Sequence, residues 1–204
     1  MAGKNSAKSK WIEPRMVLTP PFVAAFPDLF ETTLNDLNGK MECRVTALFP
    51  KDADLSELKR TIDAAAKDKW PSGLPPKSKT PLRDQAEFGK VNDETGQYEL
   101  YAGATPGAMF MRLRTEEVPQ IVDVARNEVT DPDRVYPGVW MRAKIRVFPF
   151  DSKGNKGVTT LIESLQLLGD GEKLVKGRKR TNAADDFPVI PDEEAAKYMA
   201  ASNF

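Results

Sequence analysis

Residues 139–150 constrain the fold of this chain most, because the character of the side chain changes at every position. The odd positions up to residue 147 are apolar: Val139, Met141, Ala143, Ile145 and Val147. The even positions are aromatic or basic: Trp140, Arg142, Lys144, Arg146, Phe148 and Phe150. Successive side chains of a strand point to opposite faces of a sheet. The segment therefore predicts a β-strand with one face in the core and one cationic, ring-bearing face.

Rings that alternate with basic side chains on a solvent-facing surface suit an unpaired polynucleotide. Bases stack on aromatic rings for about 1–3 kcal/mol each, and basic groups neutralise the phosphates. The candidate stacking residues are Trp140, Phe148 and Phe150, and the candidate phosphate ligands are Arg142, Lys144 and Arg146. Lys153 and Lys156 extend the positive charge into the next loop. An ordinary solvated sheet face, with Trp140 buried beneath a helix, is the alternative interpretation.

A shorter version of the same alternation occurs at residues 109–114. Here Phe110, Arg112 and Arg114 share one face of a predicted strand. We expect this strand to lie beside the longer one and to extend the same surface. Lys77 and Lys79, in the preceding proline-rich loop, supply further positive charge.

The chain has no histidine and a single cysteine among its 204 residues. Without histidine, the Ser-His and Cys-His nucleophile pairs and the usual general base near neutral pH are excluded. One cysteine, Cys43, excludes an intramolecular disulfide, and its apolar neighbours predict a buried, inert thiol. Scattered carboxylates such as Asp84 and Asp123 lack a spacing that singles out a two-metal nuclease. We therefore expect a binding protein without metal or cofactor, rather than an enzyme.

The pattern along the chain favours a β-rich fold. Strand patterns occur at residues 16–30, where three prolines interrupt them, and at 40–49. Residues 52–70 predict an amphipathic helix, with Asp54 as its cap and Leu55, Leu58, Ile62 and Ala65 on its apolar face. Several short strands, turn signals and one helix favour a small antiparallel barrel or sandwich. No apolar run approaches the roughly 20 residues of a membrane span, and no secretory signal is expected.

Charge is segregated near the C-terminal end, although the net charge of the chain is zero. Residues 170–182 carry five basic and two acidic side chains, whereas residues 183–204 carry five acidic side chains and one basic. Loss of periodicity predicts a flexible tail from residue 176. The tail either binds a basic pocket of a partner, competes for the cationic surface, or only adds solubility. Its candidate partner-binding residues are Asp185, Asp186, Phe187, Asp192, Glu193, Glu194 and Phe204.

Longer stretches of the sequence resemble a known family. YPGVWMRAKIRVFPFDSKGNKGVTTLIESLQLLGDGEKL at residues 136–174, with a downstream DDF, is similar to the C-terminal half of the tailed-phage single-stranded DNA-binding proteins. FPDLFE, TALFPKDADLSELKRTIDAAAKDKW and PLRD resemble the N-terminal half of this family, in the right order. The resemblance covers residues 17–187.

The resemblance implies a mainly β structure with one or two helices, in an oligonucleotide/oligosaccharide-binding (OB) fold. This fold is a five-stranded Greek-key β-barrel, here with additions. The expected parts are a flexible basic N-terminus (1–15), a DNA-binding domain (16–175) and the tail (176–204).

The family implies binding of single-stranded DNA, largely without sequence preference, in phage DNA replication, recombination or repair. We expect this in the cytoplasm of a bacterial host, with replication proteins as partners of the tail. A phage structural or assembly protein that docks an acidic partner on its cationic sheet face is the alternative.

Overall fold

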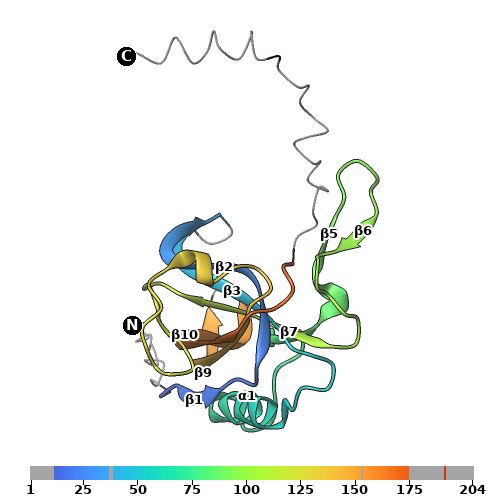
Figure 1. The fold of residues 1–204 in the computed structure, drawn as a ribbon. Coiled ribbons are helices and arrows are strands. Elements are labelled where there is room, and N and C mark those ends of the chain that lie inside the picture. The colour runs from blue at the N-terminus through green and yellow to red at the C-terminus, as the bar shows by residue number, and fades with distance from the viewer. Residues whose placement is uncertain (1–11, 37–38, 153, 175–190, 192–204) are drawn as a thin grey trace, which may run out of the picture.

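The structure, a computed structural model, describes residues 12–36, 39–152, 154–174 and 191 (Figure 1). Its strands are β1 (Arg15–Leu18), β2 (Phe22–Asn35), β3 (Lys40–Leu48), β4 (Leu82–Asp84), β5 (Gly89–Val91), β6 (Tyr98–Leu100), β7 (Met109–Thr115), β8 (Gln120–Val122), β9 (Trp140–Ser152) and β10 (Asn155–Gly169). The helices of the described residues are α1 (Ser56–Lys69) and the short 3-10 turns η1 (Gln85–Glu87) and η2 (Pro132–Arg134).

Most strands join one mixed sheet in the order β4-β7-β3-β2-β9-β10-β8, with β1 paired to β9. Strand β8 runs parallel to β10, and the other pairs of this sheet are antiparallel. Strands β5 and β6 form a separate hairpin that stands out beside β7 (Figure 1). The mainly β prediction with one α-helix is thus confirmed. The backbone ladders do not close into a complete barrel.

The core lies on the side of the sheet that α1 covers. Val139, Met141, Ala143, Ile145 and Val147 are fully buried there, so the predicted inward face of β9 is confirmed. Helix α1 buries Leu58, Ile62, Ala65 and Ala66 against this core, as its sequence period predicts. The Asp54 carboxylate accepts a hydrogen bond from the Ser56 backbone N–H at 3.0 Å. We call the opposite side of the sheet the outer face.

Strand β2 is sharply bent between Ala25 and Asp28, where its pairing with β3 shifts register. Phe26 occupies this bulge with φ of +48°, a left-handed conformation that bulky residues rarely adopt. Pro27 follows and cannot donate a ladder hydrogen bond. The bend matches the prediction that prolines interrupt this strand, and it turns the Phe26 ring away from the core.

A second apolar cluster lies on the outer face. Ala25, Leu48, Phe88 and Phe110 are buried in it. Tyr101 and Leu174 pack against it from segments that cross over the sheet, and the rings of Phe88 and Phe110 lie 5.3 Å apart. The outer face is therefore covered at one end and open elsewhere.

Residues 170–174, which we call the strap, cross the outer face after β10. The hydroxyl of Tyr136 donates to Oδ1 of Asp170 at 3.1 Å, and the Leu174 N–H donates to the Pro137 carbonyl at 2.9 Å. Gly138, at φ of +120°, permits the crossing, because a Cβ there would lie 2.0 Å from the Glu172 carbonyl oxygen. The strap is therefore fastened to the turn before β9.

Within the described ranges, no helix is long and apolar enough to cross a membrane. In the same part of the chain, no cluster of three or more histidine, cysteine or acidic side chains is arranged to hold a metal ion. Cys43 is buried, and desolvation, followed by the charges of Asp28 and Glu31, raises the pKa of its thiol. A thiol with a raised pKa is a poor nucleophile, in keeping with the inert role predicted for it.

Candidate nucleic-acid interface

Strand register brings residues from five strands into one row on the outer face. Phe110 lies opposite Arg83 on β4 and Leu48 on β3, while Val23 on β2 lies opposite Leu48 and Trp140 on β9. Trp140 and Phe110 therefore share a face of the sheet, as the sequence predicts for one continuous surface. They are separated by β3 and β2, so β7 is not the immediate neighbour of β9 that we expected.

The next rows of the outer face carry arginines, which we call the arginine face: Arg44, Arg112 and Arg114. Arg44 on β3 lies directly opposite Arg114 on β7, and Arg112 lies opposite Thr46. The Arg112 guanidinium stands 6.0 Å from the centre of the Phe110 ring. Three guanidinium groups on adjacent strands form a compact cluster of hydrogen-bond donors, which suits phosphates.

Two of these arginines have carboxylate partners. Arg44 lies 3.6 Å from the Asp28 carboxylate, and Arg114 lies 3.6 Å from the Glu42 carboxylate. Glu42 is only 2% exposed and accepts a hydrogen bond from the Asn35 side-chain amide at 2.8 Å. Within the described part of the chain, Arg112 has no carboxylate at ion-pair distance. Arg112 can therefore meet a phosphate without breaking an existing ion pair.

Phe110, which we expected on the DNA-binding surface, is not accessible to a base in this structure. Its ring is 0% exposed, because Phe88 and the segment around Tyr101 cover the outer face at this point. Alternation along β7 places Phe110 and Arg112 on the same face, but it does not reveal which positions a later segment covers. Phe110 instead packs beneath two guanidinium groups, those of Arg83 and Arg112, which lie 5.4 Å and 6.0 Å from its ring centre.

The structure exposes a different ring at this place, that of Phe26. Phe26 is 56% exposed and packs edge-on against Tyr101, with ring centres 5.1 Å apart. A bulky residue held in a left-handed conformation costs about 1–3 kcal/mol, and such outliers gather at functional sites. The sequence does not reveal Phe26 as a surface residue, because the bulge breaks the alternation that identifies a strand face. Its only local signal is an aromatic residue between an apolar strand and a proline.

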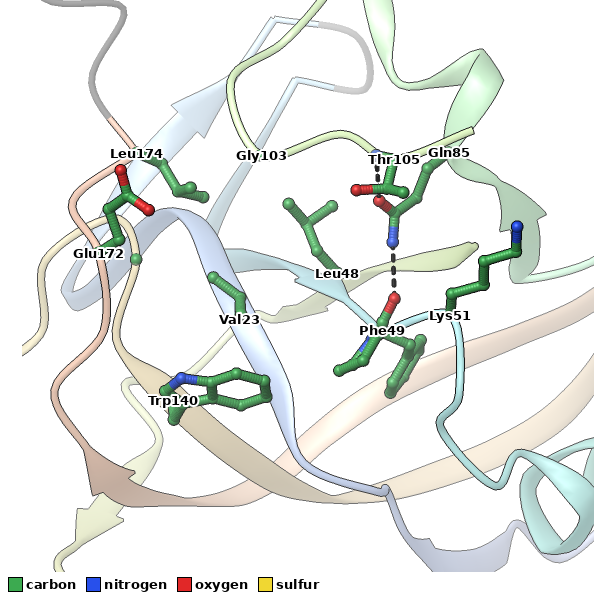
Figure 2. A pocket seen from close by; sticks show the side chains of 12 residues that line it. Val23, Leu48, Phe49, Lys51, Gln85, Gly103, Thr105, Trp140, Glu172 and Leu174 are labelled. Carbon is green, nitrogen blue, oxygen red and sulfur yellow. Dashed lines mark hydrogen bonds between the residues drawn. The ribbon is translucent and has the colours of Figure 1, made fainter. Parts of the chain in front are cut away.

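Trp140 lines a pocket of about 350 Å³ at the other end of the outer row (Figure 2). Val23 and Leu48 form its floor, and the strap and the segment around Gly103 and Thr105 form its walls. The indole is partly exposed and does not lie beneath α1, which covers the opposite side of the sheet. The alternative that placed Trp140 beneath the helix is therefore wrong.

The remaining outward side chains of β9 form a second cationic surface, which we call the β9 face: Arg142, Lys144, Arg146, Phe148 and Phe150. Arg142 donates to the Gln166 side chain at 2.7 Å. The Nε of Arg146 lies 2.9 Å from a Glu163 carboxylate oxygen, an ion-pair distance without hydrogen-bond geometry. Lys144 is exposed and has no ion-pair partner within the described residues. Both phenylalanine rings are half-buried.

The β9 face is bordered by β1, whose register places Met16 beside Arg146 and Leu18 beside Lys144. Both apolar side chains are nearly half exposed, at 45% and 48%. Beyond Met141, β9 pairs with β1 instead of β2. Strand β1, rather than β7, therefore lies beside the β9 face.

The predicted loop lysines lie around the β9–β10 turn or outside the described residues. The Lys79 N–H donates to the Lys156 carbonyl at 2.8 Å, so this loop is fastened to the start of β10. The Lys156 ammonium lies 3.6 Å from Asp151, and Lys77 is exposed. Lys153 lies outside the described residues. So do the tail residues Asp185, Asp186, Phe187, Asp192, Glu193, Glu194 and Phe204.

Comparison of this chain with known proteins identifies its family. The family model described as Enterobacter phage Enc34, ssDNA-binding protein, matches residues 16–198. Protein p50 of Acyrthosiphon pisum secondary endosymbiont phage 1 is 25% identical over 175 residues, which are 83% of this chain and 92% of that protein.

Two solved structures share the fold. The single-stranded DNA-binding protein from bacteriophage Enc34 in complex with ssDNA aligns with a TM-score of 0.61 and 16% identity, over 85% of this chain and 100% of that one. A C-terminal truncation of the Enc34 protein aligns with a TM-score of 0.59 and 18% identity, over 78% of this chain and 88% of that one. Because the family model spans most of the sequence, the chain belongs to the Enc34 family of phage single-stranded DNA-binding proteins.

Proposed function

We propose that this protein binds single-stranded DNA, largely without sequence preference, during phage DNA replication, recombination or repair in the bacterial host cell. The observation that carries the proposal is the arginine face, where three guanidinium groups on neighbouring strands lie next to the exposed ring of Phe26. Arginines hold the phosphates, and the ring offers a flat surface to an unpaired base. The role is binding rather than catalysis.

The strand order supports an OB fold with additions. In chain order, β2, β3, β7, β9 and β10 are the first to fifth strands of the proposed barrel. Along the sheet they lie in the order third, second, first, fourth and fifth, on the path β7-β3-β2-β9-β10. Strands β7 and β10 approach each other without a ladder, and the Thr160 hydroxyl lies 3.9 Å from the Met111 sulfur. OB folds bind oligonucleotides on the face of their second and third strands. In chain order these strands are β3 and β7, which carry the arginine face.

The β9 face is the second part of the proposed interface. Lys144, Arg142 and Arg146 carry its charge, with Phe148 and Phe150 as flanking rings and Lys77, Lys79, Lys153 and Lys156 beyond them. A strand that leaves the arginine face past Trp140 meets this surface next. We further propose that the acidic tail recruits replication proteins.

The rival function, a phage structural protein that docks an acidic partner, uses the same positive charge but needs no exposed ring. Fluorescence anisotropy with a labelled oligo-dT strand and a matched duplex separates the two functions. We expect clear preference for the single strand, because duplex bases do not present their faces to a ring. Equal affinity for strand and duplex, or no binding at low salt, contradicts the proposal.

The variant Phe26→Gly tests the stacking part. It removes the exposed ring while glycine accepts the positive φ without strain. We expect it to weaken oligo-dT binding by about 1–3 kcal/mol, the value of one stacked base. Val124→Gly is the matched control, since Val124 is 67% exposed in a loop outside the arginine face. Unchanged affinity of Phe26→Gly would remove Phe26 from the interface.

A further inference from the structure

The pocket beside Trp140 has the shape of a site for one flat heterocycle. Its floor, formed by Val23 and Leu48, is apolar, and the Trp140 ring lies along one side (Figure 2). Its volume of about 350 Å³ accommodates a nucleobase and part of its sugar. Apolar walls with a few polar groups at the rim are typical of small-molecule sites.

Some polar groups of the pocket already form hydrogen bonds within the protein, and others do not. The Gln85 amide nitrogen donates to the carbonyls of Phe49 and Met109, both at 2.8 Å, and its oxygen accepts from the Thr105 N–H at 2.8 Å. Gln85 therefore holds the wall together and has little capacity left for a ligand. Two charged side chains of the lining, Lys51 and Glu172, have no ion-pair partner among the residues that the structure describes.

These two charges lie on different sides of the pocket. Glu172, from the strap, lies on the side of Trp140, and Lys51 lies on the opposite side (Figure 2). A carboxylate accepts hydrogen bonds only, whereas an ammonium group donates only. Figure 2 shows the Glu172 carboxylate at the rim of the pocket, next to Leu174, so that a base stacked on Trp140 can turn one edge toward this acceptor, while Lys51 is placed for a phosphate.

We propose that this pocket holds one base of the bound strand and favours cytosine over thymine through Glu172. The amino group of cytosine donates to a carboxylate, which is a standard pairing in base recognition. Thymine presents an oxygen at the same position, and that oxygen repels the carboxylate. The two rings are of similar size, so the discrimination comes from the exocyclic group.

The pocket and the arginine face lie on either side of one covered cluster of the outer face. Leu48 belongs both to the pocket floor and to the cluster beneath Phe26, and Phe110 follows Leu48 in the outer row toward Arg112. A strand held by the arginine face therefore passes over this cluster to place a base beside Trp140. The inference rests on the proposed function and adds one position with a base preference to an otherwise tolerant interface.

The test compares oligo-dC with oligo-dT of equal length at neutral pH, by anisotropy, in the full chain. Because Glu172 is exposed and the hydrogen bond is single, we expect a preference for dC of about three-fold, below the range of a buried bidentate contact. The informative quantity is the ratio of the dC and dT affinities in each variant relative to wild type, because it cancels differences in stacking between the two strands.

Glu172→Gln should lower this ratio to about one or below, because its amide donates to the thymine oxygen as readily as it accepts from cytosine. Glu172→Asp should keep part of the preference. Glu57→Gln, an exposed change on α1, is the matched control and should leave the ratio unchanged. Trp140→Ala should weaken binding of both strands and also lower the ratio.

The outcomes separate the two proposals. Tight binding of both strands with a ratio that Glu172→Gln does not change would overturn the base pocket and leave the proposed function standing. Failure of wild type to bind either strand would overturn both. Thermal melting of each variant shows whether the strap still folds. Quenching of Trp140 fluorescence by oligo-dC, in a variant with Trp11→Phe and Trp70→Phe, checks the stacking directly, and absence of quenching would also overturn the base pocket.

Discussion

Arg112 provides the sharpest test of how this protein holds a phosphate backbone. It is the arginine of the arginine face without a carboxylate partner among the described residues, so the change Arg112→Ala removes one cation and breaks no ion pair. On a single strand, each phosphate contact contributes about −0.7 to the slope of log K against log salt concentration. If Arg112 makes one contact, the slope should become shallower by about 0.7.

The size of the effect follows from that slope. A four-fold rise in salt weakens binding by about 2.6-fold for each phosphate contact. Arg112→Ala should therefore lose about 2.6-fold less affinity than wild type over that range. At low salt it should bind about five-fold more weakly, the value of one exposed charge-assisted contact of about 1 kcal/mol.

Salt-titrated anisotropy with oligo-dT measures both quantities. Arg60→Ala, on the solvent side of α1, is the matched control, because it removes the same charge from the opposite side of the sheet. Lys144→Ala reports in the same way on the β9 face. An unchanged slope for Arg112→Ala, or an equal change for Arg60→Ala, would refute the assignment of the arginine face.

Three further predictions concern stability. Arg114→Ala should lower the free energy of unfolding by about 1–3 kcal/mol in urea titrations, because the buried carboxylate of Glu42 loses its cationic neighbour. Gly138→Ala should cost more than about 2 kcal/mol, because its Cβ would lie 2.0 Å from the Glu172 carbonyl oxygen and φ is positive. Asp84→Asn should reduce the fall in melting temperature between about pH 5 and pH 3.

The sign of the pH effect follows from the pKa of Asp84. Hydrogen bonds from the backbone N–H groups of Ala86 and then Gly107 lower this pKa in the folded protein. The unfolded chain therefore binds the proton more readily, and the stabilisation is lost as the pH falls through the folded pKa. An identical acid profile for wild type and Asp84→Asn would contradict this reasoning.

Matched controls distinguish these effects from general sensitivity to substitution. For Arg114→Ala the control is Arg112→Ala, which should change the free energy of unfolding by less than about 0.5 kcal/mol. For Gly138→Ala the control is Gly154→Ala, where φ is also positive but no atom lies within 4 Å of the new Cβ. If Gly154→Ala cost as much as Gly138→Ala, the close approach of the strap would not be the cause.

Much of the fold can be predicted from the sequence, because burial of one sheet face makes apolar and polar residues alternate along a strand. This alternation correctly predicts the inward side of β9 from Val139 to Val147, as the helical spacing does the apolar side of α1. It does not predict strand order, since the register that places Arg44 opposite Arg114 depends on pairing between distant segments. The sequence therefore predicts that Arg112 and Arg114 share a face, whereas their juxtaposition with Arg44 is seen only in the structure.

The candidate site was harder to predict, because a side chain that leaves the core does not always reach solvent. Phe110 and Trp140 both point to the outer face, yet residues 85–105 and the strap bury the first and enclose the second in a pocket. Phe26 shows the converse. Phe26 lies in a bulge, where side chains do not alternate between the two faces of the sheet. The alternation of residue types therefore does not identify this exposed ring beside the arginine face.

The two ends of the main sheet bear on how closely copies of this protein can crowd together on a strand. Along its main path the sheet terminates in β4 and β8, each only three residues long and each directly preceded by a proline, Pro81 or Pro119, and β1 adds a border of four residues beside β9. Short borders next to residues without an N–H offer few unpaired backbone groups to a neighbouring sheet. Molecules can therefore be concentrated side by side on nucleic acid with little tendency to fuse their sheets into aggregates.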